Sequence, residues 1–367
     1  MKICVVGGGN LGHYIVAKLG NQHEVSVLTR EASEWSEIIV AEDISGKVFS
    51  GKVCEVSENP ESVLVGRELI FVTWPTHIVA EKMCTIEKYI EAGTMICFCP
   101  GYGGKEFICK NLINKGVIVL GTQRVFSSTK ILERGKRVQC IDNRPYVQIA
   151  VIPASESQIC KTLIEDLFQK PCIVYENYLN ITFTPSNPVL HTSRLYSLFK
   201  EHKAGQVYEE HFAFYSNWSE KASEVLIKCD DELQEICTEL SLIDTSGVKS
   251  LKEHYEIAFV DAENDVCRMT KKIRSLKFLK DFAPMIKCET GYMIDLSARY
   301  FKEDFAYGLN VIANFAQILG VDTPQMNEIL SWYTKIMNIA NLEDENKFLP
   351  TKMGICTKEN IYDFYLR

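Results

Sequence analysis

The feature that most constrains this fold is the glycine-rich turn at residues 7–12, close to the start of the sequence. It follows a short apolar run, Lys2–Val6, and precedes a helical-looking stretch at residues 13–19 and a second apolar run, Glu24–Leu28. Strand, glycine turn, helix and strand in this order are typical of the right-handed crossover that binds a dinucleotide. The sequence therefore predicts an α/β domain of the Rossmann type, with a doubly wound sheet, at the front of the chain.

Each glycine of the G-x-G-x-x-G pattern has a separate job. Gly7 allows the tight turn, Gly9 leaves room for a pyrophosphate against the backbone, and Gly12 lets the helix pack closely on the strand. The free N–H groups at the start of the new helix point at that pyrophosphate, so Asn10 and Leu11 join the glycines as expected cofactor-binding residues. The alternative is a glycine-rich turn without a ligand, which the flanking strands and helix make the weaker interpretation.

The end of the second apolar run indicates which dinucleotide fits. An NAD site usually carries Asp or Glu there, bonded to the ribose hydroxyls, whereas this run ends in Leu28, Thr29 and Arg30. An acid would repel a 2′-phosphate, and Arg30 can pair with one through its guanidinium fork. We therefore expect NADPH as the cofactor, held in part by Thr29 and Arg30. NADH stays open, because Arg30 can instead stack on the adenine or face solvent.

Composition limits the partners and the compartment. The net charge is −8 and there is no basic tract, which argues against nucleic acid and an anionic membrane surface as partners. No apolar stretch is long enough to span a bilayer, and the early first strand leaves no room for a signal peptide. The fourteen cysteines are scattered without a C-x-x-C pair. They suit reduced, buried thiols in a cytoplasmic protein better than disulfides or a metal site.

Three further apolar runs end in polar or glycine-rich segments. The runs are residues 68–73, 94–99 and 117–120, and the segments after them contain Trp74-Pro75, the loop 100–104 with Tyr102, and Thr122-Gln123. The carboxyl ends of such strands meet at one edge of an open α/β sheet, where ligands bind. The convergence predicts a binding site there, with Trp74 and Pro75 against the cofactor.

The remaining pattern divides the chain in two. Residues 138–141 and 147–152 look like a pair of strands, whereas residues 31–66 are hard to assign. Beyond about residue 180 the chain becomes helical, with apolar residues at steps of three and four. The expected architecture is α/β followed by all-α: a Rossmann domain over residues 1–180, an all-helical substrate domain over residues 181–367, and an active cleft between them.

Two stretches of the helical half can supply a proton donor. The first is residues 186–191, with Arg194 one turn further on. Asn187 is a good N-cap and Pro188 a good first helical residue, so His191 is expected in the first turn of a helix. A nearby carboxylate would make its imidazole a useful general acid. The alternative for His191 is a packed or solvent-facing side chain.

The second stretch is residues 299–304, with the sequence Arg-Tyr-Phe-Lys-Glu-Asp. Spacing alone leaves two interpretations open. The acids and bases can belong to an active site, or Asp304 can cap the next helix while Arg299 and Glu303 form an ordinary surface pair.

Together these motifs resemble the octopine/nopaline (opine) dehydrogenases. The resemblance rests on Asn187-Pro-Val-Leu-His191, on residues 299–304 with the Tyr-Gly-Leu at 307–309, and on Gly-Val-Asp-Thr-Pro at 320–324. The glycine turn, the loop 100–104 and Thr122-Gln123 agree with it. The resemblance implies an oxidoreductase acting on CH–NH bonds. Such enzymes join the amine of an amino acid to a 2-oxo acid, commonly pyruvate, and reduce the imine with NADH or NADPH.

The resemblance also implies roles for single residues. His191 would be the catalytic acid/base, Asp304 its partner, and Arg299 a contact to the cofactor phosphates or an aid to domain closure. Substrate contacts are expected from Tyr102, Thr122, Gln123 and Arg194.

Three positions depart from the family pattern. Gly121 stands where the family often has Glu, which leaves the amino substrate open, a basic one above all. Thr192-Ser193-Arg194 follows the histidine where Pro and small residues are common, so that Arg194 can bind a substrate carboxylate. Ala306 stands where Pro is often found, which affects only helix geometry.

Two alternatives to an opine dehydrogenase remain. A ketoacid reductase of the ketopantoate or glycerol-phosphate type shares the architecture but uses a catalytic lysine, and no lysine here sits in a comparable motif. A dinucleotide-binding regulator without turnover is disfavoured by the intact His191 and Asp304. The sequence leaves open which amino acid and 2-oxo acid are used and whether the chain forms a homodimer.

Overall fold

The structure is a computed structural model that describes residues 1–142, 144–254, 265–276 and 282–366. The chain divides into two compact units. The first is Met1–Thr182 together with the end of the chain from Tyr365, and the second is Phe183–Phe364. Within the described residues, no helix has the length and apolar character needed to cross a membrane.

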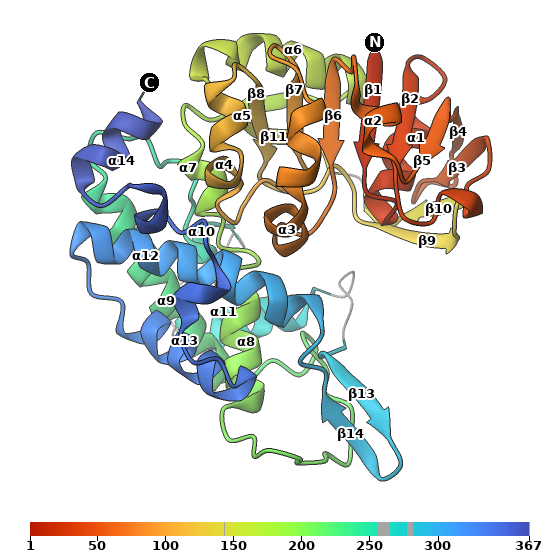
Figure 1. The fold of residues 1–367 in the computed structure, drawn as a ribbon. Helices are drawn as coiled ribbons and strands as arrows, with labels where there is room; N and C mark the ends of the chain where they lie inside the picture. Colours follow the sequence, from red (N-terminus) through yellow and green to blue (C-terminus); the bar gives the residue numbers. More distant parts are fainter. Residues whose placement is uncertain (143, 255–264, 277–281, 367) are drawn as a thin grey trace. The chain divides into compact units, whose positions relative to one another are not determined.

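An eight-stranded sheet forms the core of the first unit (Figure 1). Its strands are β1 (Lys2–Val6), β2 (Glu24–Leu28), β5 (Glu55–Ser57), β6 (Leu69–Val72), β7 (Met95–Phe98), β8 (Ile118–Thr122), β11 (Val147–Ile152) and β12 (Cys172–Val174). The order is β12-β11-β8-β7-β6-β1-β2-β5. All neighbours are parallel except β8 and β11, which are antiparallel. The predicted Rossmann-type sheet is confirmed.

The helices of this unit follow the strands as crossovers. They are α1 (Asn10–Leu19), α2 (Pro60–Leu64), α3 (Thr76–Ile86), α4 (Lys105–Ile108), α5 (Lys110–Asn114), α6 (Ser157–Phe168) and α7 (Leu179–Thr182). The carboxylate of Glu106, at the start of α4, accepts hydrogen bonds from the hydroxyls of Thr182 and Tyr365. The end of the chain is therefore anchored in the interior of the first unit.

A second sheet takes two of its strands from the stretch 31–66 that the sequence left unassigned. It has the order β4-β3-β10-β9, with β3 (Ile38–Glu42), β4 (Val48–Lys52), β9 (Thr129–Glu133) and β10 (Arg137–Cys140). The strands predicted at residues 138–141 and 147–152 are present as β10 and β11, but they do not pair with each other. β10 pairs with β3 and β9, whereas β11 pairs with β8 and β12.

Helix α1 contacts strands of both sheets. Glycines permit the close contact with β4, because a Cβ on Gly51 would lie 2.1 Å from the Val16 carbonyl oxygen and one on Gly20 would lie 2.4 Å from the Lys52 carbonyl oxygen. The helix that follows the glycine turn is thus fixed by packing on two sides.

The second unit is mainly helical, as predicted. Its elements are α8 (Leu190–Phe199), α9 (Glu220–Glu239), α10 (Leu251–His254), α11 (Asp265–Arg274), a π-helical segment η4 (Tyr300–Leu309), α12 (Asn310–Leu319), α13 (Pro324–Met337), α14 (Lys358–Tyr365) and the hairpin β13 (Met285–Cys288)–β14 (Gly291–Ile294). The hairpin is an addition that the helical periodicity did not predict.

Helix α9 is central to this unit and contacts α8, α11, α12 and α13 (Figure 1). It begins at a capped end, where Ser219 accepts a hydrogen bond from the N–H of Ala222 at 3.1 Å. Leu226, Leu233 and Ile236 are fully buried on one face. The three- and four-residue steps in the sequence therefore did mark the core of the helical unit.

Candidate active site

The glycine turn joins β1 to α1 and has the geometry of a phosphate cradle. Gly7 has a φ of +118°, in the left-handed region that favours glycine. A Cβ on Gly12 would lie 2.1 Å from the Gly7 carbonyl oxygen, so a side chain there would push the helix off the strand. A Cβ on Gly9 would meet nothing within 4 Å. The first N–H groups of α1, at Asn10 and Leu11, have no acceptor within the helix, and this open space in front of them fits a pyrophosphate.

A histidine that the sequence analysis did not single out holds this turn in place. His13 is fully buried, and its Nδ1 lies 2.9 Å from the Gly9 carbonyl oxygen. Its Nε2 accepts a hydrogen bond from the N–H of Gly135 at 2.8 Å, so Nδ1 carries the hydrogen that is donated to Gly9. Burial lowers the pKa of His13, which favours this neutral form. A histidine four residues after the second glycine of the motif is the signal that could have revealed it.

Two further predicted cofactor residues have defined surroundings in this region. Asn10 accepts a hydrogen bond from the N–H of Ile131 on β9 at 2.8 Å, so its side chain ties the helix start to the second sheet. Trp74, which follows β6, lies beside the turn, because a Cβ on Gly7 would be 3.2 Å from its Cδ1. Pro75 caps α3 immediately after it.

Arg30 is exposed just after β2, and among the described residues it has no hydrogen bond or ion pair. The neighbouring carboxylate of Glu31 forms an ion pair with Arg134, which weakens its repulsion of a phosphate bound at Arg30. Thr29 is buried beneath Arg30, and its N–H donates to the Ser57 carbonyl at 3.1 Å. The guanidinium at this strand end is therefore available for a ligand phosphate.

The predicted substrate residues of the first unit lie in its interior. Tyr102, Thr122 and Gln123 are all buried. Gln123 donates from Nε2 to the Asn180 carbonyl at 3.1 Å, and the buried ammonium of Lys105 donates to the Tyr102 carbonyl at 2.9 Å. Because a buried side chain cannot reach a substrate without a local rearrangement, this geometry favours packing roles for Tyr102 and Thr122.

The helical unit brings His191 and Asp304 together, although 113 residues separate them in the sequence. His191 Nδ1 lies 2.9 Å from Asp304 Oδ2, and the carboxylate is 1% exposed. Helix α8 carries His191 and begins at Leu190 after a turn at residues 186–189, and its N-cap residue is Val189, two residues beyond the predicted Asn187. Asp304 projects from the π-helical segment η4, an irregularity that often marks a functional site.

Tyr215 is a second partner of this histidine, and it lies in no motif that the sequence analysis identified. Its hydroxyl lies 3.2 Å from His191 Nε2. Since the Asp304 carboxylate only accepts hydrogen bonds, Nδ1–H donates to it, and Nε2 accepts the hydrogen of the tyrosine hydroxyl. The rings of Phe214 and Tyr300 stand edge-on to the imidazole at centroid distances of 5.6 and 5.0 Å. The imidazole thus has one fixed orientation and a mostly apolar enclosure.

The two predicted arginines of this unit have different surroundings. Arg194 is 2% exposed and donates to the carbonyls of Phe214, Ala213 and Asn217 at 2.7, 2.8 and 2.9 Å. It therefore fixes the segment that carries Tyr215, which argues against its prediction as a substrate contact. Arg299 is largely exposed and lies 3.0 Å from Glu303 Oε2, which is the i,i+4 pair that the spacing allowed, but the Glu303 side chain is only 3% exposed, so this is not an ordinary surface pair.

Comparisons with known proteins agree with this division. The family model described as NAD/NADP octopine/nopaline dehydrogenase, alpha-helical domain, matches residues 174–337, and the model for ketopantoate reductase PanE/ApbA matches residues 3–136. Tauropine dehydrogenase of Arabella iricolor is 24% identical over 367 residues, which cover 91% of this chain and 91% of that protein.

Two solved structures share the fold over nearly the whole chain. Octopine dehydrogenase with NADH and L-arginine superposes with a TM-score of 0.83 at 18% identity, covering 98% of this chain and 97% of that chain. Yersinopine dehydrogenase with NADP+ bound superposes with a TM-score of 0.67 at 11% identity, covering 98% and 99%.

Proposed function

This chain belongs to the octopine/nopaline dehydrogenase family, and from that premise we propose that it reductively joins an amino acid to a 2-oxo acid. The enzyme is an NAD(P)H-dependent oxidoreductase acting on CH–NH bonds. The observation that carries the proposal is the buried pair of His191 and Asp304 within the family's helical domain. It provides the proton-transfer group that forming and reducing an imine requires.

The first unit supplies the dinucleotide site. Gly7, Gly9 and Gly12 hold the pyrophosphate in the space before α1, and His13 keeps the turn in shape through the Gly9 carbonyl. The dinucleotide, when bound, supplies the hydride that reduces the imine carbon. NADPH is the proposed cofactor, because Arg30 is exposed and free to pair with a 2′-phosphate where an acid would select NADH.

The helical unit supplies the acid/base. His191 Nε2 takes a proton from the amine nitrogen as that nitrogen forms its bond to the carbonyl carbon. The same imidazole returns this proton to the carbonyl oxygen, which becomes the hydroxyl of a carbinolamine. A second proton passes in the same way from the nitrogen to this hydroxyl, which then leaves as water and yields the imine. Asp304 holds the ring in the Nδ1–H form and stabilises the positive charge between the two transfers.

Tyr215 is a positioning residue in this proposal. Its hydroxyl is hydrogen-bonded to His191 Nε2, the atom that must exchange a proton with the substrate. When the amine binds, the hydroxyl therefore either moves away from Nε2 or lies between the amine and the imidazole. Arg194 acts one step further away, since it fixes the backbone on either side of Tyr215. Arg299 is exposed at the start of η4 and remains the proposed contact to the cofactor phosphates.

The match of residues 3–136 to ketopantoate reductase is an observation in favour of the ketoacid reductase alternative. That match covers the nucleotide-binding part, which both kinds of enzyme need, whereas the helical part matches the octopine/nopaline dehydrogenases. The opine dehydrogenase interpretation therefore explains the whole chain.

A substrate panel tests the proposal. Protein and NADPH are mixed with pyruvate alone, with single amino acids alone, and with both, and NADPH absorbance is followed. We expect oxidation only when both substrates are present. Oxidation with pyruvate alone would favour the ketoacid reductase, and tight NADPH binding without any turnover would favour a regulator.

A further inference from the structure

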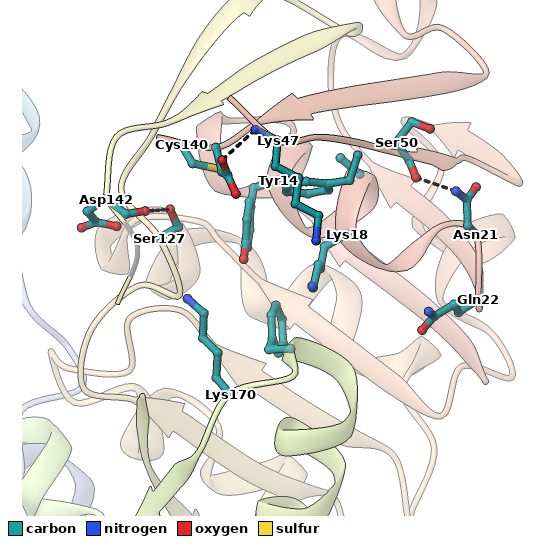
Figure 2. Close-up of a pocket in the computed structure, with 14 residues that line it drawn as sticks. Tyr14, Lys18, Asn21, Gln22, Lys47, Ser50, Ser127, Cys140, Asp142 and Lys170 are labelled. Atoms are coloured by element: carbon teal, nitrogen blue, oxygen red, sulfur yellow. Dashed lines mark hydrogen bonds between the residues drawn. The ribbon is translucent and has the colours of Figure 1, made fainter. Parts of the chain in front are cut away.

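A pocket of about 310 Å³ opens in the first unit, within the size range of small-molecule sites. Its walls come from α1, the β3–β4 hairpin, the β9–β10 region and the end of α6 with Lys170 just beyond it (Figure 2). Lys18, Asn21 and Gln22 place it at the carboxyl end of α1, whereas the glycine turn lies at the amino end. A ten-residue helix is about 15 Å long, so the pocket is separate from the dinucleotide site.

Three lysines from three different elements line this pocket. Figure 2 shows the ammonium groups of Lys18 and Lys47 on one side of the Tyr14 side chain and that of Lys170 on the other. Burial lowers the pKa of Lys18 and of Lys170, and the neighbouring Lys47 lowers that of Lys18 further. Lys18 is thus repelled by Lys47 and by Lys170 in a partly desolvated space, while the nearby Asp142 attracts Lys170.

The acids of the pocket do not neutralise these lysines directly. Asp142 accepts hydrogen bonds from the N–H and hydroxyl of Ser128 and lies 3.3 Å from Arg144. Asp43 is occupied by the N–H and hydroxyl of Ser45 and by the backbone N–H of Lys47. Among the described residues, no acid lies within 4 Å of the ammonium groups of Lys18, Lys47 or Lys170. Lys170 donates one hydrogen bond, to the Phe126 carbonyl at 3.2 Å, and an ammonium has three donors.

The hydroxyl of Tyr14 also faces this space (Figure 2). Tyr14 is 5% exposed, lines the pocket, and has no hydrogen-bond partner among the described residues. Burial raises its pKa, so the phenol stays protonated and can donate. Its ring, with Phe49 and Phe168, forms an apolar wall beside the charges. This hydroxyl can therefore donate a hydrogen bond to an anion bound in the pocket.

We propose that this pocket binds a small organic dianion, a metabolite that carries either a phosphate or paired carboxylates. Its acidic end lies among the ammonium groups of Lys18, Lys47 and Lys170 and accepts from the Tyr14 hydroxyl. Its remaining atoms pack against the aromatic wall. We assign only ligand binding to this pocket, with no chemical step. The proposal is independent of the proposed catalytic function, because the pocket contains none of the residues assigned to catalysis or to dinucleotide binding.

Calorimetric titration of the full chain tests the proposal. The protein is saturated with NADPH, so that phosphate probes cannot enter the dinucleotide site, and ionic strength is held constant with chloride. The probes are inorganic phosphate, adenosine monophosphate and citrate. We expect one-site binding of at least one probe. Binding of the phosphates without citrate identifies a phosphate ligand, and the reverse identifies a carboxylate ligand. Absence of saturable binding by all three at millimolar concentration would overturn the proposal.

Variants connect such binding to the pocket. The double variant Lys18→Gln/Lys170→Gln is expected to weaken binding at least about tenfold, since a hydrogen bond to a charged group is equivalent to one or two decades of affinity. Lys47→Gln, at an exposed turn, gives the same test where the double variant fails to fold. Lys52→Gln is the matched control, because Lys52 lies on β4 outside the pocket and pairs with Glu37. Equal affinity in the pocket variants and the parent protein would place the binding elsewhere and overturn the proposal.

Discussion

Replacing Asp304 by asparagine tests whether the buried carboxylate beside His191 is needed for acid/base catalysis. The carboxylate is 1% exposed and lies 2.9 Å from His191 Nδ1. Asparagine keeps the size of the side chain but removes the charge that stabilises a protonated imidazole. Two unit charges about 4 Å apart interact by about 4 kcal/mol at an effective dielectric constant of about 20. That free energy corresponds to about three decades in rate, so Asp304→Asn is expected to lower kcat about 1000-fold.

The assay is steady-state NADPH oxidation with both substrates present. The KM for NADPH is expected to stay within about twofold, because the substitution lies outside the unit that carries the glycine turn. Asp344→Asn is the matched control, since that side chain is 75% exposed and lies 3.7 Å from the surface Lys352. Thermal unfolding of the variant excludes a folding defect. A kcat within threefold of the parent value would refute the assigned role of the Asp304 carboxylate.

Four further predictions follow from single contacts. Arg30→Ala is expected to raise the KM for NADPH about tenfold and to change that for NADH little, since a charge-assisted phosphate contact is lost; equal changes would count against NADPH selection. Tyr215→Phe is expected to lower kcat without changing the KM for NADPH, because it removes only the hydroxyl on the catalytic imidazole. Gly12→Ala would place a Cβ 2.1 Å from the Gly7 carbonyl oxygen, so the helix must shift away from the strand. Nucleotide affinity should fall, and the free energy of unfolding should drop by about 1–3 kcal/mol. An unchanged melting temperature would contradict this. Burial raises the pKa of the Glu106 carboxyl from 4.5 to about 7. The folded protein therefore binds this proton more tightly than the unfolded chain does. The free energy of unfolding is expected to fall by up to about 3 kcal/mol as the pH rises from about 4.5 through 7. Glu106→Gln should flatten that decline in denaturant melts, and a decline of equal slope would exclude this carboxyl as its source.

The parts of the fold that could be predicted are those with a local signal. The glycine turn fixed the first crossover, because Gly7 and Gly12 have few substitutes at such close backbone approaches. The apolar steps that include Leu233 and Ile236 predicted α9, because these residues lie on one buried face of the helix.

The second sheet had no comparable signal. Its strands are short, and Ile38 and Val48 expose their side chains, so an alternating pattern does not separate an inner from an outer face. The pairing of β10 with β3 joins residues about one hundred positions apart, and no local propensity specifies such a contact.

The candidate site was predictable to a similar extent. His191 and Asp304 carried motif information, whereas Tyr215 lies in a segment without regular secondary structure and so without periodicity. The sequence could not show that Arg194 is a structural residue and not a substrate contact. Its hydrogen bonds go to three backbone carbonyls about twenty residues away in the chain. The lysine pocket was equally hidden, since Lys18, Lys47 and Lys170 meet only through packing of three elements.

Product analysis tests the central claim most directly. The protein is incubated with NADPH, pyruvate and a mixture of amino acids, and the products are identified by mass spectrometry. The account predicts a secondary amine whose mass is that of one amino acid plus pyruvate, less water and plus two hydrogens, absent with His191→Ala. Formation of lactate alone, or of the same secondary amine at an unchanged rate in His191→Ala, would contradict it.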